Sequence, residues 1–170
     1  MRKPASMWSL ESFCRVKLSK HFYMRDFMYS EISGFHGVPN IPESPDLAIE
    51  NGRAFCTQLL DPLEETFGRV AVRSGYRSPA LNQFGNENKL NCARHDNPLE
   101  CHIWDRDAGE AAIAGAAIVI PWFADRYAAG RDWRDLAWWM HDHLDYSEIW
   151  FFPKLCAFNL VWRATPKRRI

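Results

Sequence analysis

Apolar residues recur at helical spacing in the first half of this chain, and this pattern limits the fold more than any other feature. The recurring residues stand four or eight positions apart: Leu47, Phe55, Leu59, Leu63 and Phe67. Such steps place them on one face of a helix. We therefore expect a helix over 45–67, with Ser44 as its N-cap and an end at Gly68. Pro62 lies inside the pattern and predicts a kink or a break, because proline has no backbone N–H.

Short apolar runs replace this pattern in the second half of the chain. The runs have the length of strands and lie at 70–72, 118–120, 147–152 and 158–162. We expect further helices from Pro79 and over 133–144. This order predicts an α+β domain with a small antiparallel sheet flanked by helices. The polar stretch 84–110 is expected to form a long loop, and a loop of that length often carries function.

Length and charge limit the class of protein. The 170 residues predict a single domain over 1–170, with an N-terminal extension at 1–17 and a basic tail at 163–170. Lys and Arg total 21, as do Asp and Glu, so the formal net charge is zero. Nucleic-acid and membrane-surface proteins usually carry a basic excess, and we expect neither partner. The sequence does not specify an oligomeric state.

Targeting segments are not expected in this chain. The longest uncharged stretch, 111–124, has 14 residues, whereas a membrane span needs about 18 or more. The N-terminus lacks the apolar run of a signal peptide, which predicts a cytoplasmic location, with a phage or virion protein as the alternative. The five cysteines are an odd number and favour free thiols.

Charge is unevenly distributed near the N-terminus. Residues 1–25 contain six Lys or Arg and one acid, whereas residues 43–65 contain six acids and one Arg. We expect these two segments to attract each other as solvated faces. A functional basic arm is the alternative.

Two segments of the first half resemble a known family. The first segment contains Leu18, Ser19, Lys20, His21, Phe22, Phe27, Ser30, Gly37, Asn40 and Pro42. The second is SGYRSP at 74–79, followed by Leu81 and Asn82. Together they resemble the zinc D-Ala-D-Ala carboxypeptidases and phage-type peptidoglycan endopeptidases of the Hedgehog/DD-peptidase fold. The resemblance covers 18–162 and is close as far as Asn82. It implies that fold, a zinc ion and a cell-wall peptide as substrate.

The SGYRSP turn would contribute the substrate-binding residues. In the family, the arginine of this turn contacts the substrate, so the resemblance implies that Arg77 does so here, with Ser74 and Tyr76 beside it. A planar guanidinium suits a carboxylate or a peptide carbonyl. The alternative is that Arg77 only ties the turn to the Asn-rich segment.

The family's zinc residues are largely replaced in this chain. The expected pattern is Ser-x-His-x-x-Gly-x-Ala-x-Asp, then a Glu, then Trp-x-His. His102 matches the first His. Ala117 stands in place of the Asp, Phe152 in place of the catalytic Glu and Asn159 in place of the last His. Glu148 precedes Phe152 by four residues, which is about 13 Å along a strand. This is too far for Glu148 to replace the catalytic Glu without a change of strand register.

Two functions are compatible with this pattern. The first is a peptidase-like protein with lost or altered catalysis that binds a cell-wall peptide or a protein partner. The alternative is an active metal-dependent peptidase or amidase with a rearranged site, in which His102 and Asp105 bind zinc and Glu148 joins His102 in catalysis.

A separate structural metal site is a further possibility in the loop. Cys92, His95, Cys101 and His102 lie within eleven residues and carry zinc-competent atoms. Their spacing matches no familiar zinc motif. The other interpretation is a loop with two thiols and no metal.

Overall fold

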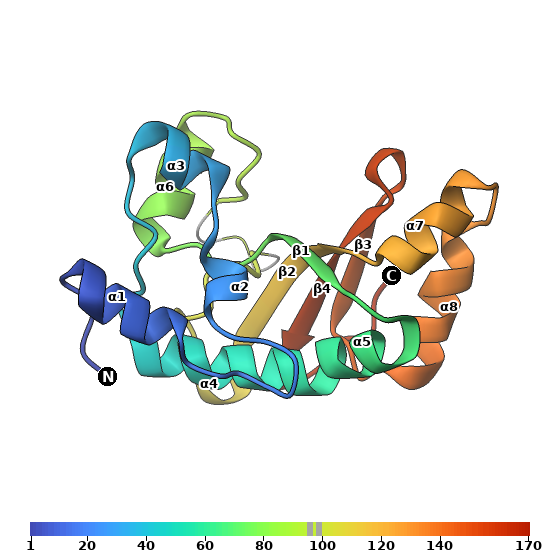
Figure 1. Ribbon diagram of the computed structural model, residues 1–170, viewed down its shortest axis with the longest axis horizontal. Coiled ribbons are helices and arrows are strands. Elements are labelled where there is room, and N and C mark those ends of the chain that lie inside the picture. Colours follow the sequence, from blue (N-terminus) through green and yellow to red (C-terminus); the bar gives the residue numbers. More distant parts are fainter. Residues whose placement is uncertain (95–96, 98–99) are drawn as a thin grey trace.

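The computed structural model describes residues 1–94, 97 and 100–170, which form an α+β fold with a four-stranded antiparallel sheet (Figure 1). This confirms the predicted α+β class with a small antiparallel sheet flanked by helices. The strand order is β1–β2–β4–β3. The strands are β1 (Ala71–Ser74), β2 (Ile113–Val119), β3 (Glu148–Phe152) and β4 (Ala157–Arg163).

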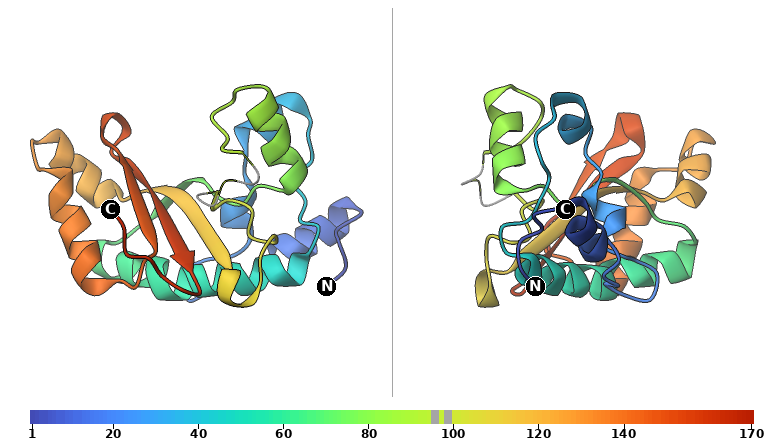
Figure 2. Two further views of the ribbon diagram at one scale, coloured as in Figure 1. Left: turned by 180° about the vertical axis from the view of Figure 1, so that it is seen from behind. Right: turned by 60° about the vertical axis from the view of Figure 1, so that its left-hand side comes forward.

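The helices lie under the sheet and at its two ends. Their bounds are α1 (Met7–Cys14), α2 (Arg25–Met28), α3 (Glu31–His36), α4 (Pro45–Phe55), α5 (Asp61–Phe67), α6 (Pro79–Glu87), α7 (Pro121–Ala128) and α8 (Trp133–His143). Helices α4 and α5 run along one face of the sheet, α3 and α6 lie together at one end, and α7 and α8 lie at the other (Figures 1 and 2).

The expected helix over 45–67 is present, with a local change in its winding. Helix α4 continues through a π-helical turn at Cys56–Leu60 into α5, which ends at Gly68. Pro62 is the second residue of α5 and follows the π-helical turn directly. The wider turn before it keeps the helix continuous, so the proline changes the winding without interrupting the helix. Ser44 precedes α4, but its side chain forms no cap hydrogen bond.

The two faces of the sheet have different neighbours. Ala116 and Leu160 belong to the main core on the face covered by α4. Because side chains alternate along a strand, the odd-numbered positions of β2 and β4 point to the opposite face. There Val161 packs on Cys101, and a Cβ added to Gly115 would lie 2.9 Å from the Cys101 side chain. Gly115 therefore lets the loop that contains Cys101 approach this face.

Several elements differ from those predicted by the sequence. The sequence pattern did not predict α1, α3 or α7, and β2 begins at Ile113 rather than at residue 118. Its first residues are rich in Ala and Gly, which are poorly represented in strands. Helix α6 extends to Glu87, so the long loop begins later than expected. Phe13 of α1 is fully buried, which attaches the N-terminal extension to the core.

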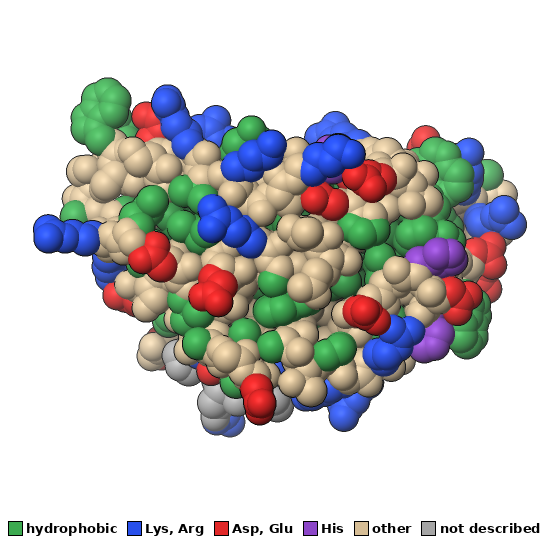
Figure 3. All heavy atoms as spheres, turned by 90° about the horizontal axis from the view of Figure 1, so that it is seen from below, with side chains coloured by type: hydrophobic (Ala, Val, Ile, Leu, Met, Phe, Trp, Pro, Cys, Tyr) green, Lys and Arg blue, Asp and Glu red, His purple; other side chains and the backbone are tan. Residues whose placement is uncertain are grey.

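The basic N-terminal and acidic segments attract each other as predicted. Lys3 Nζ lies 2.5 Å from Glu43 Oε1, and Lys20 Nζ lies 2.8 Å from Glu65 Oε1. These pairs are exposed, and such pairs usually contribute less than about 1 kcal/mol each. Seen from below, acidic and basic side chains are interspersed with apolar ones (Figure 3).

The basic tail lies along the outer edge of β3. The backbone N–H of Arg169 donates to Ser147 O, and that of Ile149 donates to Arg169 O, both at 2.9 Å. Arg168 also donates to Leu144 O at the C-terminal end of α8. These bonds hold the tail against an edge that would otherwise be open. Within the described ranges 1–94, 97 and 100–170, no helix has the length and hydropathy needed to cross a membrane.

Candidate functional site

The two segments that carry the family resemblance fold against each other. The Asn40 side chain joins them: its Nδ2 donates to Tyr76 O at 2.9 Å, and its Oδ1 accepts from the Ser78 N–H at 2.7 Å. Gly75 lies directly against α2, since a Cβ there would be 2.6 Å from the Cα and carbonyl oxygen of Phe27. The SGYRSP turn is therefore held in place by the first segment.

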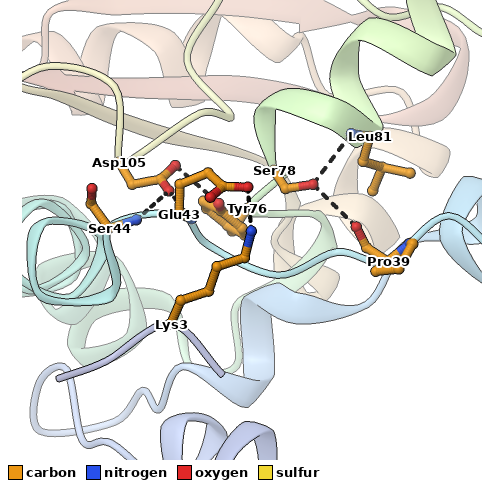
Figure 4. Close-up of polar contacts among 8 residues, drawn as sticks. All are labelled: Lys3, Pro39, Glu43, Ser44, Tyr76, Ser78, Leu81 and Asp105. Carbon is orange, nitrogen blue, oxygen red and sulfur yellow. Dashed lines mark hydrogen bonds and ion pairs between the residues drawn. The ribbon is translucent and has the colours of Figure 1, made fainter. Parts of the chain in front are cut away.

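Asp105 connects this turn to the start of α4 (Figure 4). Its Oδ1 accepts from the Tyr76 hydroxyl at 2.9 Å, and its Oδ2 accepts from the backbone N–H groups of Glu43 and Ser44 at 2.7 and 3.1 Å. Burial and the nearby Asp105 carboxylate raise the pKa of Tyr76 well above its usual range. Figure 4 also shows Ser78 capping α6, with its Oγ accepting from the Leu81 N–H.

A pocket of about 210 Å³ lies on the sheet face opposite α4. Its polar and thiol lining includes Ser74, Arg77, Glu100, Cys101, His102 and Asn159, and Ala117 and Phe152 add apolar surface. Ser74 pairs with Ala117 across β1 and β2, and Ala117 pairs with Asn159 across β2 and β4. The structure thus gathers His102 and the three positions assigned by the resemblance to the other zinc-site residues.

His102 is held in one neutral form. Its Nδ1 lies 2.7 Å from Gly75 O, and because a carbonyl only accepts, Nδ1 carries the proton. Burial, with a smaller effect of the Arg77 charge, lowers the pKa of His102 to about 3. The backbone is fixed as well: Arg77 N donates to His102 O, and His102 N donates to Glu100 Oε1. At neutral pH, Nε2 is therefore a hydrogen-bond acceptor.

This pKa predicts how stability changes with pH. Between about pH 6.5 and 3 the unfolded chain protonates His102 and the folded chain does not, so the free energy of unfolding falls as the pH is lowered. The limiting slope is ~1.4 kcal/mol per pH unit, which gives a loss on the order of 2 kcal/mol between pH 7 and 5. Urea denaturation should show this loss in the native chain and a much smaller one in His102→Gln. Equal losses in both chains would contradict the assignment.

Arg77 has both a structural contact and unused donors. Its Nη1 donates to Asn82 Oδ1 at 3.0 Å and its Nη2 to Ser74 Oγ at 3.3 Å, while Asn82 Nδ2 donates to Ala93 O. Arg77 therefore does tie the turn to the Asn-rich segment. A guanidinium has five donors, and the Cys92 thiol also lies close enough to interact with it. Among the described residues, no carboxylate lies within ion-pair distance of Arg77.

Some of the other polar groups of the pocket already have hydrogen-bond partners, and others do not. Glu100 is 2% exposed, accepts from the His102 N–H and has further partners. Burial raises the pKa of the Cys101 thiol to about 12, so it is protonated at neutral pH and a poor nucleophile. The Asn159 amide has no hydrogen-bond partner in the described part of the chain. The sequence interpretation missed Glu100, whose one indication was its place beside Cys101 and His102.

Asp105 and Glu148 do not line this pocket. Both oxygens of Asp105 accept hydrogen bonds from Tyr76, Glu43 and Ser44. The Glu148 carboxylate pairs with Arg163 at 3.2 Å and with Lys167 at 3.7 Å. Neither carboxylate lines the pocket with His102, and their metal-binding and catalytic roles stay predictions.

The positions that the resemblance assigns to zinc binding do not provide a full set of zinc ligands in this chain. His102 offers a nitrogen, but Ala117 and Phe152 offer no ligand, and the neutral amide of Asn159 is a weak one. Outside 95–96 and 98–99, no three His, Cys, Asp or Glu side chains are grouped to hold a metal ion. His95 of the alternative cluster lies outside the described residues, so that cluster stays a prediction.

The pocket places hydrogen-bonding groups of both kinds, donors and acceptors, beside apolar surface. It combines the Arg77 guanidinium, the Asn159 amide and the Nε2 acceptor of His102 with an apolar floor. These groups suit a carboxylate and a peptide unit. Comparisons with protein-family models, with curated proteins and with solved structures gave no match.

Proposed function

We propose that this chain is a non-hydrolytic relative of the zinc D-Ala-D-Ala carboxypeptidases, with their Hedgehog/DD-peptidase fold. In this proposal, the protein binds the C-terminal carboxylate of a cell-wall peptide in the pocket around Arg77. One observation carries the proposal: Ser74, Arg77 and His102 line one pocket with Ala117 and Asn159, as the resemblance requires. The antiparallel sheet with helices agrees with that fold.

The residues of the pocket suggest how the peptide is held. The peptide carboxylate accepts from the Arg77 guanidinium, which has no paired carboxylate among the described residues. A peptide N–H donates to His102 Nε2, and the Asn159 amide donates to a peptide carbonyl. Ala117 and Phe152 offer apolar surface for small side chains. Phe152 cannot take up a proton from water as the family's glutamate does, so the bound peptide stays intact.

Calorimetry with a peptide ending in D-Ala-D-Ala tests this proposal. The native chain should bind the free carboxylate form more tightly than the C-terminal amide. Arg77→Gln should weaken binding about 10-fold or more, because hydrogen bonds to a charged group contribute about 1.5–3 kcal/mol. Arg73→Gln is the matched control, since Arg73 is exposed and lies outside the pocket.

Two results would overturn the proposal. Equal affinity for the acid and amide forms would show that no carboxylate site exists. Mass spectrometry with and without added zinc would detect cleavage. Steady conversion of the peptide to shorter products would show an active enzyme. Circular dichroism of Arg77→Gln must first match the native chain, because Arg77 also ties the turn to Asn82.

A further inference from the structure

We propose that Trp150 forms a second subsite beside the pocket, and that the ligand is an extended peptide of at least four residues. This inference rests on the proposed function, which places the peptide carboxylate at Arg77. The peptide would cross the sheet from Arg77 and pack its fourth residue from the carboxyl end on the Trp150 indole.

The strand register places Trp150 next to the pocket. Trp150 of β3 pairs with Asn159 of β4, and side chains of directly opposite residues lie on the same face about 5 Å apart. Asn159 lines the pocket. Phe152, two residues further along β3, points to the same face and also lines the pocket. Trp150 therefore borders the end of the pocket that is remote from β1.

The Trp150 side chain is exposed and, among the described residues, free of polar and ring contacts. It is 67% exposed, and within the described segments its ring and Nε1 have neither a ring contact nor a hydrogen bond. Two other exposed tryptophans have partners: Arg126 stacks on Trp122 at 3.5 Å, and Trp138 contacts His141. Trp8 of α1 is as free as Trp150 at 74% exposed, but it does not lie on the sheet. An exposed indole with free faces and a free donor favours binding of an apolar or cationic side chain.

The width of the sheet sets the length of the peptide. Ser74, Ala117, Asn159 and Trp150 form one row across the four strands. Three steps between strands of about 4.8 Å each span roughly 14 Å. The Arg77 guanidinium lies at the Ser74 end of this row, 3.3 Å from its hydroxyl. An extended peptide rises about 3.4 Å per residue, so roughly four residues reach Trp150.

Calorimetry with peptides of two to five residues, all ending in D-Ala-D-Ala, tests the subsite. Affinity should rise at least 5-fold between three and four residues and change little afterwards. Trp150→Ala should reduce the affinity for the four-residue peptide to that for the three-residue peptide and leave the binding of the shorter peptides unchanged. Trp150→Phe should retain part of the gain. Trp138→Ala is the matched control, because Trp138 is 62% exposed and lies outside the pocket.

The outcomes separate this inference from the proposed function. If all peptide lengths bind with equal affinity, and Arg77→Gln weakens this binding while Trp150→Ala does not, the subsite is overturned and the carboxylate site stays in place. Binding that does not respond to Arg77→Gln, or no binding at any length, would overturn both.

Discussion

Replacing Asp105 with alanine should lower the free energy of unfolding by about 3–5 kcal/mol. The carboxylate accepts three hydrogen bonds, from the Tyr76 hydroxyl and from two backbone N–H groups before α4. Tyr76 is fully buried, so its hydroxyl would lose its partner without gaining water. Each unsatisfied buried group costs about 1–3 kcal/mol. Urea denaturation at pH 7 measures the loss, and Asp105→Asn should lose less because it keeps an acceptor oxygen.

A nearby carboxylate provides the control for this experiment. Asp107 is partly buried and pairs with its neighbour Arg106, so Asp107→Ala should lower the free energy of unfolding by about 1 kcal/mol or less. Urea denaturation of the native chain with and without a chelator separates two roles of Asp105: the structural role, and the metal-binding role predicted by its place after His102. Two results together would contradict the structural role. The native chain would be less stable with the chelator, and Asp105→Ala would leave the free energy of unfolding unchanged.

The second large effect is expected at Gly75, where Gly75→Ala should destabilise the chain by about 3 kcal/mol or more. The added Cβ would lie 2.6 Å from the Cα and carbonyl oxygen of Phe27. Backbone atoms cannot rotate away as a side chain can, so α2 and the SGYRSP turn would have to separate. Because Gly75 O also accepts from His102 Nδ1, the variant should also displace His102 and weaken the proposed peptide binding.

Gly34→Ala is the control for Gly75→Ala. Gly34 lies in α3, and a Cβ there would have nothing within 4 Å. Alanine favours helix over glycine by about 1 kcal/mol, so this variant should be neutral or slightly more stable in thermal denaturation. Similar midpoints for Gly75→Ala and Gly34→Ala would show that the close approach to Phe27 is unimportant.

The sequence predicted the elements whose side chains follow a clear period. The period predicted the helix over 45–67, and the four strands were found from short apolar runs. The start of β2 was missed because Ala and Gly residues resemble neither strand nor helix strongly. Helix α7 was missed, and it begins at Pro121, just after β2. Proline is well suited to a first helical turn, so this residue was a signal for the start of the helix.

The pocket was predictable in part. The resemblance named Ser74, Arg77 and His102, and the structure brings them together. Asp105 is three residues after His102 but does not line the pocket. In an irregular loop, the distance between two residues along the sequence does not determine where their side chains point. Trp150 had no local pattern to mark it, since its position beside the pocket depends on the pairing of β3 with β4.

Restoring the missing ligands would test most directly whether this pocket occupies the place of a peptidase zinc centre. Ala117 and Asn159 lie opposite each other and share the pocket with His102. Cβ atoms of such a pair are about 5 Å apart, which suits joint binding of one metal ion. The double variant Ala117→Asp, Asn159→His should retain one zinc per chain after dialysis and lose it when His102→Ala is added. A folded double variant that retains no zinc, or retains it without His102, would contradict this placement.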